Sequence, residues 1–319
     1  MTRIGILTSG GDSPGMNAAI RSVVRTAIYC GHEVLGIYSG YQGLVEDEIK
    51  RMDLSSVGDI IHRGGTILGT SRCPEFEKET GREKALKTIQ KHKIEKLVVL
   101  GGDGSFHGAL SLAEKGLDVL GIPCTIDNDL GYTDYTIGFF TAVETITEAI
   151  GRIRDTSSSH ERGHVIEVMG RRCGDLALYA GISGGAESII VPEEKANLDV
   201  INQKVIQGKE RGKRHHIILV TEGTWDPYRL AERIQNETDV ETKVTILGYV
   251  QRGGTPNISD RIMATNLAAQ GILALEKIHG AYAMAFKNNR AEILSLREAL
   301  KIEKKFSKTL YQEIQMVSI

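Results

Sequence analysis

Two carboxylates separated by one residue follow an expected buried strand at residues 119–122. They are Asp127 and Asp129, in the run Thr-Ile-Asp-Asn-Asp at 125–129. Open α/β sheets bind ligands just outside the carboxyl ends of their strands, so this position suits an active site. If the run is extended, both carboxylates point to the same side, where one could accept a hydroxyl proton and the other could assist a metal ion. The alternative is a surface turn rich in Asp and Asn.

Glycine-rich loops follow two other expected strands, at residues 8–12 (Thr-Ser-Gly-Gly-Asp) and 101–105 (Gly-Gly-Asp-Gly-Ser). In each loop, backbone N–H groups and the positive end of the following helix would meet, which suits a phosphate group. Asp103 could hold Mg²⁺, which takes one or two carboxylates together with phosphate oxygens. The alternatives are a tight strand-to-helix turn in the first loop and a helix cap at Asp103 or Ser105 in the second.

Arginine and glutamate side chains complete the set of candidate ligand contacts. Arg72 follows Gly-Thr-Ser, Arg171 follows Met-Gly, and Arg252 precedes two glycines. Guanidinium groups make paired contacts with phosphate oxygens, and a surface ion pair is the alternative at each position. Glu222, after the expected strand at 216–220, could accept sugar hydroxyls or lie in a solvated turn. These residues and the three loops predict a site for a phosphorylated nucleotide, a metal ion and a hydroxyl group that becomes phosphorylated.

Strands and helices alternate through most of the chain, which predicts an α/β fold. The expected strands are residues 3–7, 34–38, 96–100, 119–122, 164–168, 188–191, 216–220, 243–247 and 282–286. The expected helices are residues 17–30, 55–62, 82–92, 106–115, 141–154, 174–182, 198–211, 229–236 and 260–278. A second alternation begins near residue 139, so we expect two three-layer α/β lobes with mainly parallel sheets and an active-site cleft between them.

The composition argues against several classes of partner. The 319 residues carry a formal net charge of −2, which gives no electrostatic basis for binding nucleic acid or a membrane. No apolar run is long enough to span a bilayer, and the first residues do not resemble a signal peptide. The cysteines are far apart and lack the spacing of a zinc site, so we expect a cytoplasmic protein with reduced thiols. They are Cys30, Cys73, Cys124 and Cys173.

Five motifs, in order and in register, resemble those of the bacterial ATP-dependent 6-phosphofructokinase family (phosphofructokinase A). They are Thr-Ser-Gly-Gly-Asp-Ser-Pro-Gly-Met-Asn at 8–17, Gly-Gly-Asp-Gly-Ser at 101–105, Thr-Ile-Asp-Asn-Asp at 125–129, Met-Gly-Arg at 169–171 and Gln-Arg-Gly-Gly at 251–254. The resemblance extends to about residue 278 and weakens beyond it. It implies transfer of a phosphoryl group from MgATP to the 1-hydroxyl of fructose 6-phosphate, which gives fructose 1,6-bisphosphate and ADP in glycolysis.

The resemblance implies a role for each matching residue. Asp127 matches the general base, Thr125 lies beside the transferred phosphoryl group, and Arg171 and Arg72 match positions that neutralise its charge. Asp103 and Asp129 match the carboxylates associated with Mg²⁺. The implied ATP contacts are Gly11, Arg72, Cys73, Gly102, Asp103, Gly104 and Ser105. The implied fructose 6-phosphate contacts are Thr125, Asp127, Asp129, Arg162, Met169, Gly170, Arg171, Glu222, Lys243, Tyr249 and Arg252.

The resemblance also implies lobes, subunits and effectors. The larger, ATP-binding lobe would be residues 1–138 plus 251–301, and the smaller, fructose 6-phosphate-binding lobe residues 139–250 plus 302–319. In the family, Arg162 and position 243 reach a neighbouring subunit, so we expect a homotetramer built as a dimer of dimers. An effector site for ADP or phosphoenolpyruvate is implied between subunits, although a solvated helix end is the alternative for the basic run at 211–215. The matching effector positions are Arg21, Arg25, Arg154, Glu187, Arg211, Lys213, Arg214 and His215.

Several positions depart from the family pattern. Lys243 replaces the usual Arg and Tyr249 the usual His, and both positions touch the sugar phosphate. Other departures are Leu54, Cys124 and the run Gly-Ala-Tyr-Ala-Met-Ala-Phe at 280–286. They motivate one alternative function, a weakly active or regulatory nucleotide-binding paralogue. A pyrophosphate-dependent phosphofructokinase is a second alternative, and Gly104 argues against it because that branch typically has Asp there.

Overall fold

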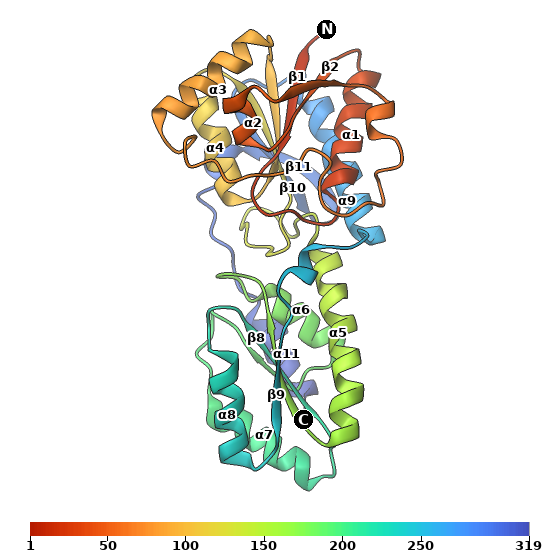
Figure 1. Cartoon of the computed structure of the whole chain (residues 1–319), viewed down its shortest axis with the longest axis vertical. Helices are drawn as coiled ribbons and strands as arrows, with labels where there is room; N and C mark the ends of the chain where they lie inside the picture. Colours follow the sequence, from red (N-terminus) through yellow and green to blue (C-terminus); the bar gives the residue numbers. More distant parts are fainter. Residues whose placement is uncertain (319) are drawn as a thin grey trace. The chain divides into compact units, whose positions relative to one another are not determined.

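The computed structural model describes residues 1–318, which form two compact units (Figure 1). The first unit contains Met1–Ile126, Leu130–Thr141 and Arg252–Lys304, and the second contains Asp127–Asp129, Ala142–Gln251 and the segment from Lys305 onward. The boundaries expected from the sequence are 138/139, 250/251 and 301/302. The short segment Asp127–Asp129 clusters with the second unit, although the residues on both sides of it belong to the first.

A seven-stranded sheet forms the centre of the first unit. In spatial order its strands are β11 (Arg290–Ser295), β10 (Ala281–Lys287), β5 (Asp118–Pro123), β4 (Lys96–Gly101), β1 (Arg3–Thr8), β2 (Glu33–Ile37) and β3 (Ile49–Met52). The five central strands are parallel, and the edge strands β3 and β11 run antiparallel to their neighbours. Every residue of β4 is buried, as expected for a parallel strand with helices on both faces of its sheet.

Helices cover both faces of this sheet. On one face, α1 (Met16–Tyr29) and α9 (Ile258–Leu275) lie side by side (Figure 1). The other face carries α2 (Tyr41–Glu46), α3 (Glu79–Lys91), α4 (Asp103–Ala113) and α10 (Leu296–Ala299). The side chains of β4 alternate between the two layers: those of Val98 and Leu100 join the core under α1 and α9, and those of Leu97 and Val99 join the core under α4.

A parallel four-stranded sheet forms the centre of the second unit. In spatial order its strands are β7 (Ser188–Ile190), β8 (His216–Thr221), β6 (Gly163–Val168) and β9 (Thr242–Ile246). One face carries α7 (Leu198–Glu210) and α8 (Pro227–Thr238), whose apolar side chains share a core with the sheet. The other helices of this unit are α5 (Phe139–His160), α6 (Asp175–Gly184) and α11 (Lys308–Val317). Gly181 of α6 packs against Ile189 and Leu219.

The predicted α/β class with mainly parallel sheets is confirmed, but the helix expected over 55–62 is wrong. Only Ser55–Val57 forms a single 3₁₀ turn, η1. The carboxylate of Asp53 accepts hydrogen bonds from Ser55 Oγ at 2.6 Å and Ser56 N at 2.8 Å, and such local contacts compete with helix formation. The helix expected from Phe106 begins earlier, at Asp103.

The elements that were not predicted are α2, β3, β11, α10, α11 and the 3₁₀ segment η2 (Gly248–Arg252). The helical segments α2, α10 and η2 contain six residues or fewer and the strand β3 contains four, so they carry little periodic signal, whereas β11 and α11 are as long as elements that were predicted. None of the helices within residues 1–318 combines the length and apolar composition needed to cross a membrane.

Candidate active site

In the first unit, the two glycine loops and Thr125 meet at the carboxyl ends of adjacent strands. β4 pairs with both β1 and β5, so the loops that follow these strands lie at one edge of the sheet. Cys124 N donates a hydrogen bond to Gly101 O at 2.9 Å. A Cβ atom at Gly101 would lie 2.6 Å from Ser9 O, and one at Gly102 would lie 3.6 Å from Thr125 Cβ. The structure therefore brings Thr125 and both glycine loops together.

The amino terminus of α4 opens directly into this edge. Its first turn contains Asp103, Gly104 and Ser105, after a cap position occupied by Gly102. No side chain within the described residues makes a capping hydrogen bond there, so the cap alternative for Asp103 and Ser105 is wrong. Asp103 is exposed, and a Cβ atom at Gly104 would meet nothing within 4 Å. The helix end thus offers N–H groups and a positive dipole to an anion.

The first glycine loop is shaped by left-handed backbone and by a guanidinium group. Gly10 has φ +87° and Gly15, which precedes α1, has φ +102°. A Cβ atom at Gly11 would lie 2.2 Å from Arg252 Nη1, so a side chain at this position would require the arginine side chain to move. Arg252, expected at the sugar phosphate, lies beside Gly11 in the first unit.

Arg72 and Cys73 follow a segment that is fixed to the end of β1. Thr8 Oγ1 donates a hydrogen bond to Gly69 O at 2.7 Å, and Thr70 Oγ1 donates one to Gly10 O at 2.8 Å. Arg72 is exposed and Cys73 is half-buried. The hydrogen bond from Thr70 to Gly10 therefore holds the backbone close to the first glycine loop two residues before Arg72.

In the second unit, Asp127 is paired with Arg171. Arg171 Nε lies 3.4 Å from Asp127 Oδ2, and the side chains of these residues are 58% and 4% exposed respectively. The run 125–129 is not extended throughout, because Asn128 has φ +52°, in the left-handed region. Alternation therefore does not determine the directions of Asp127 and Asp129.

Loops after β6 and β8 place further expected residues around Arg171. Arg171 N donates a hydrogen bond to Glu222 Oε1 at 3.1 Å. Met169 N donates one to Gln251 Oε1 at 3.0 Å. Gly170, between Met169 and Arg171, has φ +136°. Glu222 therefore anchors the backbone of Arg171. A side chain in a merely solvated turn, the alternative for Glu222, would not make this contact.

Arg162 and Lys243 lie at the other end of the same sheet. Arg162 precedes β6, and Lys243 is the second residue of β9, whose first residue pairs with the first residue of β6. Both cations bind Glu241, with Arg162 Nε at 2.5 Å and Lys243 Nζ at 2.7 Å. Hydrogen bonds from Lys243 and then Arg162 lower the pKa of Glu241. Within one chain, these cations are therefore not gathered with Arg171 and Glu222. Tyr249, in η2, is 82% exposed.

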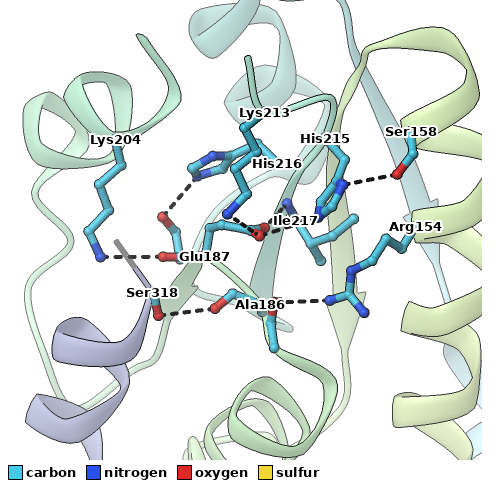
Figure 2. Close-up of polar contacts among 12 residues, drawn as sticks. Arg154, Ser158, Ala186, Glu187, Lys204, Lys213, His215, His216, Ile217 and Ser318 are labelled. Carbon is cyan, nitrogen blue, oxygen red and sulfur yellow. Dashed lines mark hydrogen bonds and ion pairs between the residues drawn. The ribbon is translucent and has the colours of Figure 1, made fainter. Parts of the chain in front are cut away.

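Glu187 has a buried carboxylate, and three other expected effector residues, Lys213, His215 and Arg154, lie near it (Figure 2). Its oxygens lie 2.8 Å from Lys213 Nζ and 3.5 Å from His215 Nε2. They also accept a hydrogen bond from Ile217 N at 2.6 Å. Arg154, on α5, donates to the carbonyl oxygen of Gly185 at 2.9 Å.

The remaining effector positions are more dispersed. Arg214 pairs with Glu161 at 3.3 Å. Arg211 follows α7, and Arg21 and Arg25 lie on α1 in the first unit. A pocket of about 230 Å³ in the second unit is lined by Lys213, Arg214 and His215, together with Arg162 and Glu241 among others.

Two supporting contacts were not predicted from the sequence. Thr136 Oγ1 donates a hydrogen bond to Thr125 O at 2.6 Å, and Gln251 binds Met169 as described above. Thr136 lies eleven positions after Thr125, and no local pattern links them. Gln251 belongs to the Gln-Arg-Gly-Gly motif, so this motif could have marked Gln251 as a candidate site residue.

The residues present are compatible with a substrate-bound magnesium ion. Across residues 1–318, no group of three or more His, Cys, Asp or Glu side chains could by itself hold a metal. Mg²⁺ in phosphoryl-transfer sites takes one or two carboxylates and completes its shell with water and phosphate oxygens. The exposed Asp103 carboxylate at the start of α4 could supply one such ligand. A magnesium ion bound in this way needs no site built from protein ligands alone.

Comparison with known proteins identifies the family. The phosphofructokinase family model matches residues 3–275. The chain belongs to the phosphofructokinase family. Proteins named ATP-dependent 6-phosphofructokinase from Finegoldia magna and Clostridioides difficile are each 54% identical over 319 residues, with all of both chains covered. A protein of the same name from Clostridium botulinum is 51% identical over 318 residues, again across both full chains.

Solved phosphofructokinase structures share the fold. The Saccharomyces cerevisiae enzyme is 35% identical with a TM-score of 0.88, and the match covers 100% of this chain and 48% of the yeast chain. A pyrophosphate-dependent phosphofructokinase from Marinobacter aquaeolei has a TM-score of 0.84 at 19% identity, covering 99% of this chain and 91% of that one. The second similarity concerns the fold alone.

We predict that His216 makes the second unit sensitive to acid. Burial lowers the pKa of His216 from 6.5 to about 4, so the folded protein binds fewer protons than the unfolded chain between these values. This contribution to stability is complete above pH 6.5 and declines as the pH falls towards 4. His216→Phe should remove it, so that the wild type loses about 2 kcal/mol more than the variant between pH 7 and pH 5 in urea unfolding.

The exposed His160 offers a control for this comparison. His160→Phe should keep the wild-type dependence of unfolding free energy on pH. Parallel curves for wild type and His216→Phe would contradict the prediction.

Proposed function

We propose that this phosphofructokinase transfers the terminal phosphoryl group of MgATP to the 1-hydroxyl of fructose 6-phosphate. The products would be fructose 1,6-bisphosphate and ADP, in glycolysis in the cytoplasm. The observation that carries this proposal is the buried Asp127 carboxylate beside Arg171. It occurs in a chain whose full-length relatives are named ATP-dependent 6-phosphofructokinase.

Asp127 is the proposed general base. A carboxylate at this position would accept the proton of the attacking sugar hydroxyl as the oxygen–phosphorus bond forms. Arg171, 3.4 Å from it, would compensate negative charge on the transferred group. Thr125, two residues before the base, would lie beside the same group. Phosphoryl transfer depends mainly on such positioning and charge stabilisation.

The first unit is the proposed nucleotide-binding part. The amino terminus of α4 and the Gly11 loop offer N–H donors and positive charge to phosphate oxygens. Arg252, beside Gly11, remains a proposed contact of the sugar phosphate. Arg72 and Cys73 would complete this part of the site. Mg²⁺, when bound, would neutralise charge on the phosphates, with Asp103 and Asp129 as its proposed carboxylate contacts.

The second unit is the proposed sugar-phosphate part, and it supports a multimeric enzyme. Met169, Arg171 and Glu222 lie at the carboxyl ends of their strands, whereas Arg162 and Lys243 lie at the opposite end of the sheet. We infer that the latter two serve the site of a neighbouring copy in a homotetramer. ADP or phosphoenolpyruvate would act as effectors at the Glu187 cluster, which offers Lys213, His215 and Arg154 to an anion.

A coupled assay with two phosphoryl donors tests the proposed donor. We expect turnover with ATP and none with pyrophosphate. Gly104→Asp should fold normally, because a Cβ atom there meets nothing within 4 Å, but it should raise the KM for ATP by adding negative charge near the phosphates. Turnover of the wild type with pyrophosphate alone would contradict the donor assignment.

Asp127→Ser should lower kcat by at least about 10²-fold, the lower range for removal of a general base. Binding of ATP, measured by calorimetry, should be little changed because the proposed nucleotide contacts lie in the first unit. An unchanged kcat would refute the assignment of Asp127 as the base.

Lys243→Arg combined with Tyr249→His should lower the KM for fructose 6-phosphate. The planar guanidinium group can make a paired contact with two phosphate oxygens, which the ammonium group of lysine does not. One additional hydrogen bond to a charged group is worth about 1.5–3 kcal/mol, or roughly 10-fold to 10²-fold in KM. A matched control is Lys209→Arg with Tyr228→His, which makes the same changes at exposed sites of the same unit. An equal fall in KM for the control, or none in the test variant, would show that the departures are compensated elsewhere.

A further inference from the structure

Asn128, between the two active-site carboxylates, is held by the segment that follows Arg171. Asn128 Nδ2 donates a hydrogen bond to Asp175 Oδ2 at 2.8 Å. Cys173 Sγ donates to the carbonyl oxygen of Asn128 at 3.8 Å. Asn128 is 1% exposed and Asp175 is 5% exposed. All three residues belong to the second unit, so both the side chain and the backbone of Asn128 are anchored within it.

This anchor fixes the backbone next to Asp127. Asn128 has φ +52°, a left-handed conformation that Asn and Asp adopt more readily than most other residues. The direction in which Asp127 leaves the chain depends on keeping that conformation. A hydrogen bond from the amide to a buried carboxylate is stronger than one between neutral groups, so Asp175 is a suitable anchor.

The same segment also fixes Arg171. Arg171 itself has φ +53° and follows Gly170, which has φ +136°. Cys173 N donates a hydrogen bond to Gly170 O at 2.8 Å, which closes the turn. Arg171 and Asn128 are therefore both held by the short segment 170–175, and the distance of 3.4 Å between Arg171 and Asp127 follows from that shared support.

We propose that Asp175, acting through Asn128, is a positioning residue that holds the Asp127 carboxylate beside Arg171 during phosphoryl transfer. This role rests on the proposed function of Asp127 as the general base. Asp175 does not take part in the chemistry. Displacement of a reacting group by about 1 Å can slow an enzyme about 10²-fold, so the anchor affects kcat more than substrate binding.

Asn128→Asp tests this role because it opposes two carboxylates while keeping a residue that tolerates the left-handed conformation. We expect kcat to fall between about 10-fold and 10²-fold, with the KM values for ATP and fructose 6-phosphate unchanged. The exchanged pair Asn128→Asp with Asp175→Asn restores one donor and one acceptor. It should recover most of the lost kcat. If either residue served only to stabilise the fold, kcat would not have to follow the hydrogen bond between them.

Asn197→Asp is the matched control. Asn197 caps α7 in the same unit, and its side chain accepts a hydrogen bond from Val200 N at 3.3 Å, which an aspartate also does. This variant should keep the wild-type kcat and melting temperature. Asp175→Ala is a second test variant, which removes the acceptor without opposing two charges, and it should show the same isolated fall in kcat if Asn128→Asp does not fold.

Asp127→Ser, measured in parallel, separates the two levels of the proposal. An active Asp127→Ser enzyme would overturn the general-base assignment and the positioning role with it. An inactive Asp127→Ser enzyme together with wild-type kcat in Asn128→Asp, or in Asp175→Ala, would overturn the positioning role alone. An exchanged pair as slow as the single variant, at the wild-type melting temperature, would also overturn it.

Discussion

Parallel strand pairing determines where the candidate site residues of this protein lie. β4 forms hydrogen bonds with both β1 and β5, so three loops from distant parts of the sequence end at one edge of the first sheet. Close backbone approach then requires glycine, because a side chain at Gly101 would collide with Ser9 O. In the second unit, pairing of β6 with β8 and β9 places Arg171 and Glu222 at one end and Arg162 and Lys243 at the other. Parallel pairing therefore brings together the residues that follow the strands, and it keeps Arg162 and Lys243, at the starts of their strands, apart from them.

Burial of carboxylates gives the second unit a recurring structural requirement. Asp127, Asp175 and Glu187 are all nearly inaccessible to water, and a buried carboxylate is tolerated only with hydrogen-bond donors or cations beside it. Arg171, Asn128 and Lys213 supply such groups respectively. Each of these partners lies in a loop at a strand end. The stability of the folded unit and the geometry of its candidate sites therefore depend on the same contacts.

Much of this arrangement could be predicted from the sequence because its signals are local. The continuous apolar run of β4 and the apolar face of α1 predicted a parallel sheet covered by helices, and glycines after strands marked the ligand loops. The left-handed conformation of Asn128 could not be predicted in the same way. It is stabilised by Asp175, which lies 47 positions away, and no local sequence pattern links the two residues. The edge strands β3 and β11 were missed because they are recognised by their pairing with β2 and β10 and not by their amino-acid composition.

The empty space beside Gly104 has a consequence for the evolution of this family. Glycine and aspartate codons differ by a single nucleotide, and the backbone at this position leaves room for a side chain. Folding therefore imposes no barrier to the residue that is typical of the pyrophosphate-dependent branch. On the proposed function, exchange of glycine for aspartate at position 104 would therefore be limited by the phosphoryl donor and not by the fold.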